Sequence, residues 1–151
     1  MDAPSPLSVE DVKQAAARIR AYIVETPLLE APLLSKELGF RLFVKAENVQ
    51  LTGSFKVRGA FNQIAQLTDD EKRKGVVAIS SGNHAQAVAY AAAAFGVKST
   101  IVMPADAPKL KLENTRRYGA EIVTYNADVA AYNDLIASIS NRSYSSYDQV
   151  K

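Results

Sequence analysis

The second half of the chain alternates short apolar runs with helical patterns, and this alternation is the feature that most constrains the fold. Continuous apolar segments lie at 76–80 (VVAIS), 99–104 (STIVMP) and 121–125 (EIVTY). Helices are expected at 84–95, 108–118 and 128–139, the first two ending at Gly96 and Gly119. Apolar strands that alternate with helices indicate parallel pairing. We therefore expect an α/β fold, a three-layer open parallel sheet with helices on both faces.

The first 70 residues follow a different pattern. Ser8 precedes two acidic residues, which predicts the start of a helix that continues to about Tyr22. A short helix at 33–38 and a strand at 41–47 are expected next. A further helix is expected from Ser54 to Leu67, because apolar side chains recur there at helical spacing: Val57, Phe61, Ile64 and Leu67.

Composition excludes several function classes. The 151 residues carry a formal net charge of +2, and the basic residues are scattered, so we expect no nucleic-acid partner. The charged run at 71–74 (EKRK) is interpreted as a solvated turn. No apolar run approaches the ~20 residues that span a bilayer, and the acidic start is unlike a targeting peptide. We expect a cytoplasmic protein with no membrane partner, no cysteine chemistry and no metal site.

Lys56 occupies an unusual position for a basic residue. It lies in the first turn of a predicted helix, where the exposed N–H groups carry about half a positive charge. That position disfavours the ammonium form and favours the neutral amine, which Schiff-base chemistry with a carbonyl requires. A solvated surface lysine is the alternative that the position alone leaves open.

The stretch SSGNHAQ (80–86) joins an apolar strand to an alanine-rich helix. In a parallel sheet this is the carboxyl edge, where ligands bind. Free N–H groups at the helix start, two serine hydroxyls and the Asn83 amide can together hold a small anion. A capped turn, with Gly82 chosen for its backbone and Asn83 as the cap, is the alternative. His84 is the only histidine of the chain and has no Asp or Ser partner at a recognisable spacing.

The seven glycines never cluster, so the chain has neither a GxGxxG fingerprint nor a P-loop. Three stretches follow one another without visible gaps: ETPLLEAPLLSKELGFRLFVKAENVQLTGSFKVRGAFNQI, VVAISSGNHAQAVAYAAAAFG and TIVMPADAPKLKLENTRRYGAEIV. Together they resemble the N-terminal part of the fold-type II pyridoxal-phosphate enzymes, in the serine/threonine dehydratase and serine racemase group. The resemblance covers about Thr26 to Tyr125 and implies an incomplete fold of the tryptophan synthase β-subunit type.

The resemblance implies a role for each matching residue. Lys56 matches the lysine that carries pyridoxal 5'-phosphate as a Schiff base and takes the Cα proton of the substrate. Phe55 matches the aromatic residue against the pyridine ring, and Asn83 matches the residue that hydrogen-bonds the phenolic oxygen of the cofactor. The substrate carboxylate would be held by the loop, namely by Ser80, Ser81, Gly82, Asn83 and His84.

The implied reaction is α,β-elimination from a small hydroxy-amino acid, which gives a 2-keto acid and ammonia, as in serine/threonine ammonia-lyases. Ser81 leaves two alternatives open. Many ammonia-lyases of the group have alanine at this position, whereas serine racemases have a serine that acts as acid and base on the opposite face of the ring. Racemisation, or elimination from a hydroxyaspartate, is therefore an alternative, and so is a Ser81 that only hydrogen-bonds the carboxylate.

The chain departs from the family in length. Members are about twice as long, and their phosphate loop would follow residue 151, so most of the cofactor affinity should be missing. The resemblance assigns residues 1–67 to the large domain and 75–151 to the small domain, with agreement weakening beyond Tyr125. The chain is then a fragment of an enzyme that forms homo-oligomers when full length, or an inactive short product that acts as an interaction partner, or a small carboxylate-binding domain. The tail at 141–151 is expected to be disordered.

Overall fold

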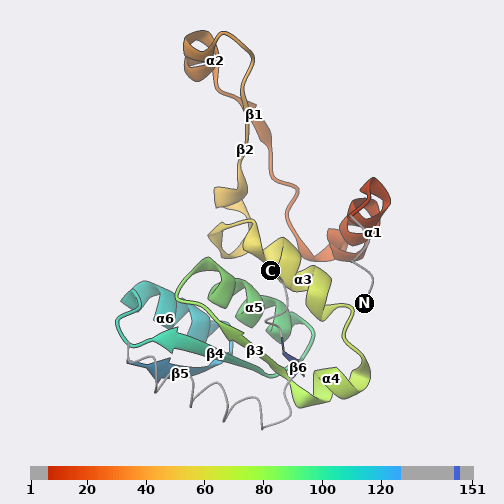
Figure 1. Cartoon of the computed structure of the whole chain (residues 1–151), viewed down its shortest axis with the longest axis vertical. Helices are drawn as coiled ribbons and strands as arrows, with labels where there is room; N and C mark the ends of the chain where they lie inside the picture. The colour runs from red at the N-terminus through yellow and green to blue at the C-terminus, as the bar shows by residue number, and fades with distance from the viewer. Residues whose placement is uncertain (1–6, 127–144, 147–151) are drawn as a thin grey trace, which may run out of the picture.

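The computed structural model describes residues 7–126 and 145–146. Its main feature is a parallel sheet with strand order β5-β4-β3-β6 (Figure 1). The strands are β3 (Val76–Ile79), β4 (Ser99–Pro104), β5 (Glu121–Tyr125) and β6 (Ser145–Ser146). In the register, Ile79 lies opposite Val102, and Val102 lies opposite Val123. The three predicted strands and their parallel pairing are therefore confirmed.

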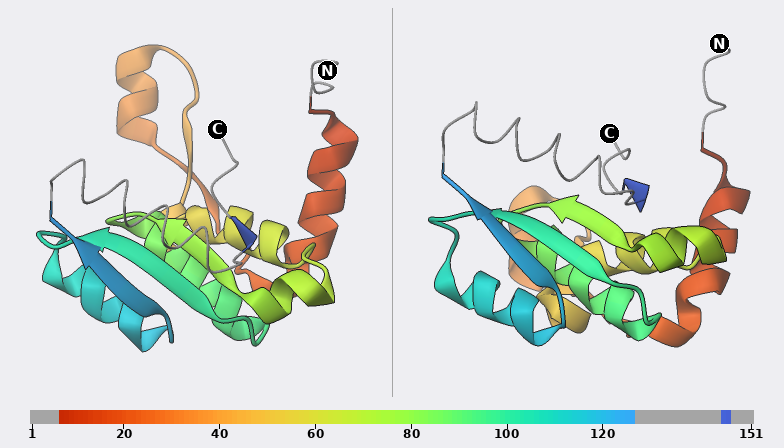
Figure 2. Two further views of the ribbon diagram at one scale, coloured as in Figure 1. Left: turned by 60° about the horizontal axis from the view of Figure 1, so that its bottom comes forward. Right: turned by 90° about the horizontal axis from the view of Figure 1, so that it is seen from below.

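Two helices cover one face of this sheet. They are α5 (Asn83–Ala94) and α6 (Lys109–Arg117), which Figure 2 shows on the same side. Left-handed glycines follow both helices, Gly96 at φ 66° and Gly119 at φ 90°, as the sequence predicts. The α/β class is confirmed, and the helix expected at 128–139, which would supply the layer on the second face, lies outside the described residues.

The hydrophobic core lies between this helix layer and α3 (Lys56–Ile64), which packs on α5. The predicted stripe of α3 is confirmed, because Val57, Phe61 and Ile64 are buried. The Phe61 ring contacts those of Tyr22, Tyr90 and Phe95. On the facing side, α5 is rich in alanine, and small side chains let the two helices approach closely. The core therefore joins the first part of the chain to the α/β part.

The N-terminal segment begins with α1 (Val9–Ile19), which a capping box between Ser8 and Asp11 starts, as predicted. A single turn of 3₁₀-helix, η1 (Arg20–Tyr22), extends it. The chain then forms the arm, residues 28–45, which projects from the body in Figure 1. In the arm, β1 (Leu28–Glu30) pairs antiparallel with β2 (Phe43–Lys45), and α2 (Pro32–Leu38) connects them.

Two predictions at the edges of the α/β part are wrong. The charged run at 71–74 belongs to a helix, α4 (Asp69–Lys74), rather than to a turn. Thr68 and Glu71 form a complete capping box there, which stabilises even a short polar helix. Within the tail, Ser145–Ser146 form β6, which pairs with Val76–Val77 at the edge of the sheet. An edge strand this short needs no apolar pattern, because backbone groups alone make the pairing.

Candidate active site

The start of α3 places Lys56 after a tight reversal of the chain. Two short 3₁₀ turns, η2 (Glu47–Val49) and η3 (Leu51–Gly53), lead to it. Thr52 adopts φ 62° and Gly53 φ 71°, both in the left-handed region. For a β-branched residue this conformation costs of order 1–3 kcal/mol, and such strain clusters at functional sites. Lys56 is exposed, and its Nζ lies 5.2 Å from the centroid of the Phe55 ring.

The first turn of α3 and the 80–84 loop lie at the same end of the α3–α5 pair (Figure 1). The rings of Phe61 and Tyr90 meet at 6.1 Å in the middle of this pair. Five residues back along each helix, about 7.5 Å along the axis, are Lys56 and Ala85. The turn η3 also contacts α5. The structure therefore brings together the two elements that carry the predicted site residues, while the role of each side chain stays a prediction.

The loop itself presents unused backbone donors. Ser80 N–H donates to the Val102 carbonyl at 3.1 Å, and Gly82 N–H donates to Ser80 Oγ at 3.2 Å. No side chain caps α5, whose N-cap residue is Gly82 rather than Asn83. A Cβ at Gly82 would meet no atom within 4 Å, so space lies beside the helix start. Ser81 and Asn83 are exposed, which suits groups that meet a ligand.

His84 is half-buried in the first turn of α5. It therefore lies on the element that carries the predicted carboxylate loop, one residue beyond the exposed Asn83.

Two residues of α6 at this edge were missed by the sequence analysis. Lys111 Nζ donates to Asn83 Oδ1 at 2.7 Å, and Asn114 Nδ2 donates to Gln86 Oε1 at 3.2 Å. The signal was available: the segments that follow adjacent parallel strands share one edge of the sheet. The Asn83 amide retains its own two N–H donors in this arrangement.

An ion pair lies beside the first turn of α3. Arg58 binds Glu47 through two hydrogen bonds, and Thr26 Oγ1 donates to the same carboxylate at 2.5 Å. The bonds from Arg58, followed by the bond from Thr26 and the positive charges of Arg58 and Lys45, lower the pKa of Glu47 to about 2 despite partial burial. Sequence reasoning missed this pair, which nothing in the spacing of residues 47 and 58 indicates.

Two buried hydroxyls precede Lys56 without partners. Thr52 Oγ1 and Ser54 Oγ have no hydrogen-bond partner in the part of the chain that the structure describes. Ser54 is only 6% exposed, and a buried hydroxyl left unpaired costs about 1–3 kcal/mol. An unpaired donor beside a primary amine indicates a place where a polar ligand could complete the hydrogen bonds.

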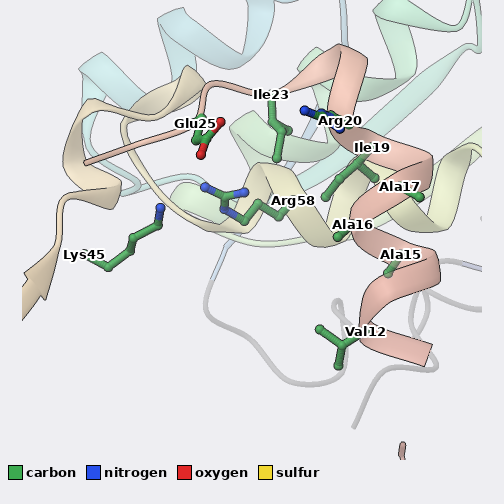
Figure 3. A pocket seen from close by; sticks show the side chains of 10 residues that line it. All are labelled: Val12, Ala15, Ala16, Ala17, Ile19, Arg20, Ile23, Glu25, Lys45 and Arg58. Atoms are coloured by element: carbon green, nitrogen blue, oxygen red, sulfur yellow. The ribbon is translucent and has the colours of Figure 1, made fainter. Parts of the chain in front are cut away.

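A pocket of about 880 Å³ lies on another side of α3, between it and α1 (Figure 3). Its lining combines an apolar face of α1 with charged residues, and includes Ile19, Glu25, Lys45 and Arg58. Neither Lys56 nor the 80–84 loop lines it. We place the candidate site at the edge of the sheet, because the reactive amine and the free helix start lie there and not in this pocket.

Within the described residues, no helix is both long and apolar enough to span a membrane. Nor do these residues contain a cluster of three or more His, Asp or Glu side chains that could hold a metal ion.

Comparisons with known proteins give one answer. Residues 19–147 match the family model described as pyridoxal-phosphate dependent enzyme. The L-threo-3-hydroxyaspartate ammonia-lyase of Saccharomyces cerevisiae is 49% identical over 116 residues, which are 77% of this chain and 36% of the relative. The catabolic L-threonine dehydratase of Escherichia coli K12 is 44% identical over 135 residues, 89% of this chain and 40% of the relative.

The fold agrees with these sequence matches. The crystal structure of serine racemase from Dictyostelium discoideum superposes with a TM-score of 0.87 at 39% identity. The match covers 94% of this chain and 47% of the racemase chain. The chain thus spans between a third and a half of the length of these relatives. The predicted family resemblance and the incomplete fold of that type are confirmed: the chain belongs to the pyridoxal-phosphate dependent enzyme family.

Proposed function

We propose that the protein acts in the elimination of ammonia from a small hydroxy-amino acid, with pyridoxal 5'-phosphate bound through Lys56. One observation carries this proposal. A helix that begins with a lysine and a helix that begins without a side-chain cap lie side by side with their first turns at the same end. The first can supply an amine and the second can hold a carboxylate.

The residues present fit the cofactor in part. An exposed primary amine, the exposed Phe55 ring and the Asn83 amide suit its aldehyde, its ring and its phenolic oxygen. The unpaired hydroxyls of Thr52 and Ser54 offer polar contacts nearby. The unclustered glycines offer no cradle for its phosphate. When bound, this cofactor withdraws electrons from the Cα of an amino acid, which makes the Cα proton acidic.

The residues of the chain would then perform the following steps. The free N–H groups at the start of α5, with Ser80 and Ser81, hold the carboxylate and orient Cα. The neutral amine of Lys56 accepts the proton from Cα, and the hydroxyl leaves Cβ as water after gaining a proton. The resulting enamine takes up water and releases ammonia, so that the net products are a 2-keto acid and ammonia.

A second substrate class and a second reaction each have an observation in their favour. The hydroxyaspartate ammonia-lyase of yeast is 49% identical, which favours a hydroxyaspartate as substrate. Ser81 is exposed in the loop, where its hydroxyl could return a proton to the opposite face of Cα, which favours racemisation.

Length and surface support a role within a larger assembly. The chain spans 36–40% of the two curated relatives compared above, and the arm exposes large apolar side chains. We propose that residues 1–67 belong to a large domain, that 75–151 belong to a small one, and that further polypeptide completes the phosphate site. A homo-oligomeric, cytoplasmic enzyme is part of this proposal. The alternative is an inactive chain that binds a full-length subunit.

The test is a keto-acid assay on the protein with serine, threonine and threo-3-hydroxyaspartate, run with added pyridoxal phosphate. We expect keto acid from at least one of these when the phosphate-binding segment is present, and none from a Lys56→Ala variant. Ser81→Ala is the matched variant for racemisation: it should abolish interconversion of serine enantiomers and leave elimination within about ten-fold. Absence of keto acid from every hydroxy-amino acid would end the lyase proposal.

A further inference from the structure

Arg58 makes contacts that the candidate active site does not use. Its Nε donates to Glu47 Oε2 at 2.9 Å and its Nη2 donates to Glu47 Oε1 at 2.7 Å. Two parallel charge-assisted bonds fix geometry as well as adding free energy. The two side chains are only 29% and 17% exposed, so water competes weakly for them. The pair therefore ties the first turn of α3 to η2.

The extended segment 24–26 completes this network. Thr26, which is 3% exposed, donates to Glu47 Oε1, and Arg58 Nη2 lies 3.5 Å from Thr26 Oγ1. Lys45 Nζ donates to the Thr26 carbonyl at 2.6 Å. Because each partner satisfies a polar group of another, removal of one leaves a partly buried charge unpaired.

The same segment also fixes the chain just before Lys56. Gln50, which is 4% exposed, donates to the Val24 carbonyl at 2.7 Å and accepts from Val24 N–H at 3.0 Å. Its Oε1 also accepts from Leu51 N–H at 3.0 Å, at the start of η3. One extended segment thus holds both the approach to α3 and its first turn.

Helical geometry converts these contacts into a direction for Lys56. Successive residues turn by about 100°, so Val57 and Arg58 lie about 100° and 200° around the helix from Lys56. Val57 is fully buried in the core, and Arg58 is bound to Glu47. A helix anchored on two sides cannot rotate about its axis, which leaves Lys56 one sector, away from the pocket that Arg58 lines (Figure 3).

We propose that Glu47 and Arg58 are positioning residues that set the direction of the Lys56 amine through the rotation of α3. This inference rests on the proposed function only in taking Lys56 as the residue that carries the cofactor. Neither residue is expected to touch the substrate.

The arm supplies a matched control. Arg41 binds Glu30 in the same fork, with Nε–Oε1 at 3.0 Å and Nη2–Oε2 at 3.2 Å. These side chains are 73% and 40% exposed, and the pair lies on the projecting arm. The two pairs share chemistry and differ in burial and in their distance along the chain from Lys56.

The experiment compares Arg58→Met with Arg41→Met in the purified protein, under conditions where both stay folded. Pyridoxal phosphate is added, borohydride fixes any adduct, and peptide mapping gives the ratio of label at Lys56 to label at the exposed Lys109. We expect Arg58→Met to lower this ratio by about ten-fold or more, because small misplacements of a reacting group cost that much. Glu47→Gln should act in the same direction, Arg58→Lys should restore part of the ratio, and Arg41→Met should leave it within about two-fold.

Hydrogen exchange gives a second readout that needs no cofactor. Amides of residues 54–60 should exchange about ten-fold faster in Arg58→Met and unchanged in Arg41→Met. A purely structural pair would lower the unfolding midpoint while the Lys56 to Lys109 ratio stayed at its original value, and that result overturns the proposal. If the parent protein carries no label at Lys56, the proposed function fails, and exchange then decides: unchanged rates at 54–60 reject the positioning role, and faster rates support it.

Discussion

The arm and the α/β part of this chain treat the same kinds of side chain in opposite ways. Phe61 is 1% exposed among three other aromatic rings, whereas Phe43 in the arm is 42% exposed. Apolar residues are exposed along most of the arm, namely Leu28, Leu29, Leu33, Leu34, Leu38, Phe40, Phe43 and Val44. Exposed apolar surface on this scale marks a contact site for another protein segment. The α/β part supplies its own core, and the arm depends on a partner.

The sharpest test of this contrast replaces one phenylalanine in each region. Phe61→Ala should lower the free energy of unfolding by about 3–5 kcal/mol, because it empties the centre of a packed cluster. Phe43→Ala should cost about 1 kcal/mol or less, because its ring is already partly in water. Urea unfolding measures both values. Equal losses would mean that the arm is as well packed as the body.

Acid unfolding compares the two ion pairs. The folded-state pKa of Glu47 is about 2, below its ordinary value of 4.5, chiefly through Arg58. A lowered carboxyl pKa contributes stability that is present above about pH 4.5 and is lost as pH falls toward 2. At about 1.4 kcal/mol for each pKa unit, the contribution is roughly 3 kcal/mol.

Glu47→Gln should therefore flatten the dependence of unfolding free energy on pH between about 4.5 and 2. Glu30→Gln, which removes the exposed pair of the arm, is the control and should retain the slope of the parent chain. The measurement is urea unfolding across this pH range. A steep slope that survives in Glu47→Gln would show that this carboxylate is not the group responsible.

A smaller effect is expected from two glycines with positive φ, one in each region. At Gly75 (φ 88°) a Cβ would lie 2.8 Å from the Lys98 carbonyl oxygen, whereas at Gly39 (φ 76°) it would meet nothing within 4 Å. Gly75→Ala should cost about 2 kcal/mol through strain and clash, and Gly39→Ala about 1 kcal/mol through strain alone. Thermal unfolding of the two variants checks the difference. Losses in the reverse order would contradict the close approach at Gly75.

The sequence predicted those features whose cause is local. The stripe Val57, Phe61 and Ile64 and the cap at Ser8 depend on spacings within one element, and both are confirmed. The capping box of α4 is equally local, at Thr68 and Glu71, and could have been recognised.

The remainder depends on which segments the fold brings together. Glu47 meets Arg58, and Lys111 meets Asn83, only after η2 packs beside α3 and α6 packs beside α5. No periodicity reports such contacts. The family resemblance reached Lys56 and the 80–84 loop, and the structure adds the neighbours that would hold them in place.

The position of covalent label tests the central claim most directly. The protein is treated with pyridoxal phosphate, reduced with borohydride and digested, and the pyridoxyl group is located by mass spectrometry. The total yield should be low where phosphate contacts are missing, but Lys56 should carry about ten-fold more label than any other lysine, and Lys56→Ala should leave only scattered label. Label spread evenly over the exposed lysines, with no excess at Lys56, would contradict the account.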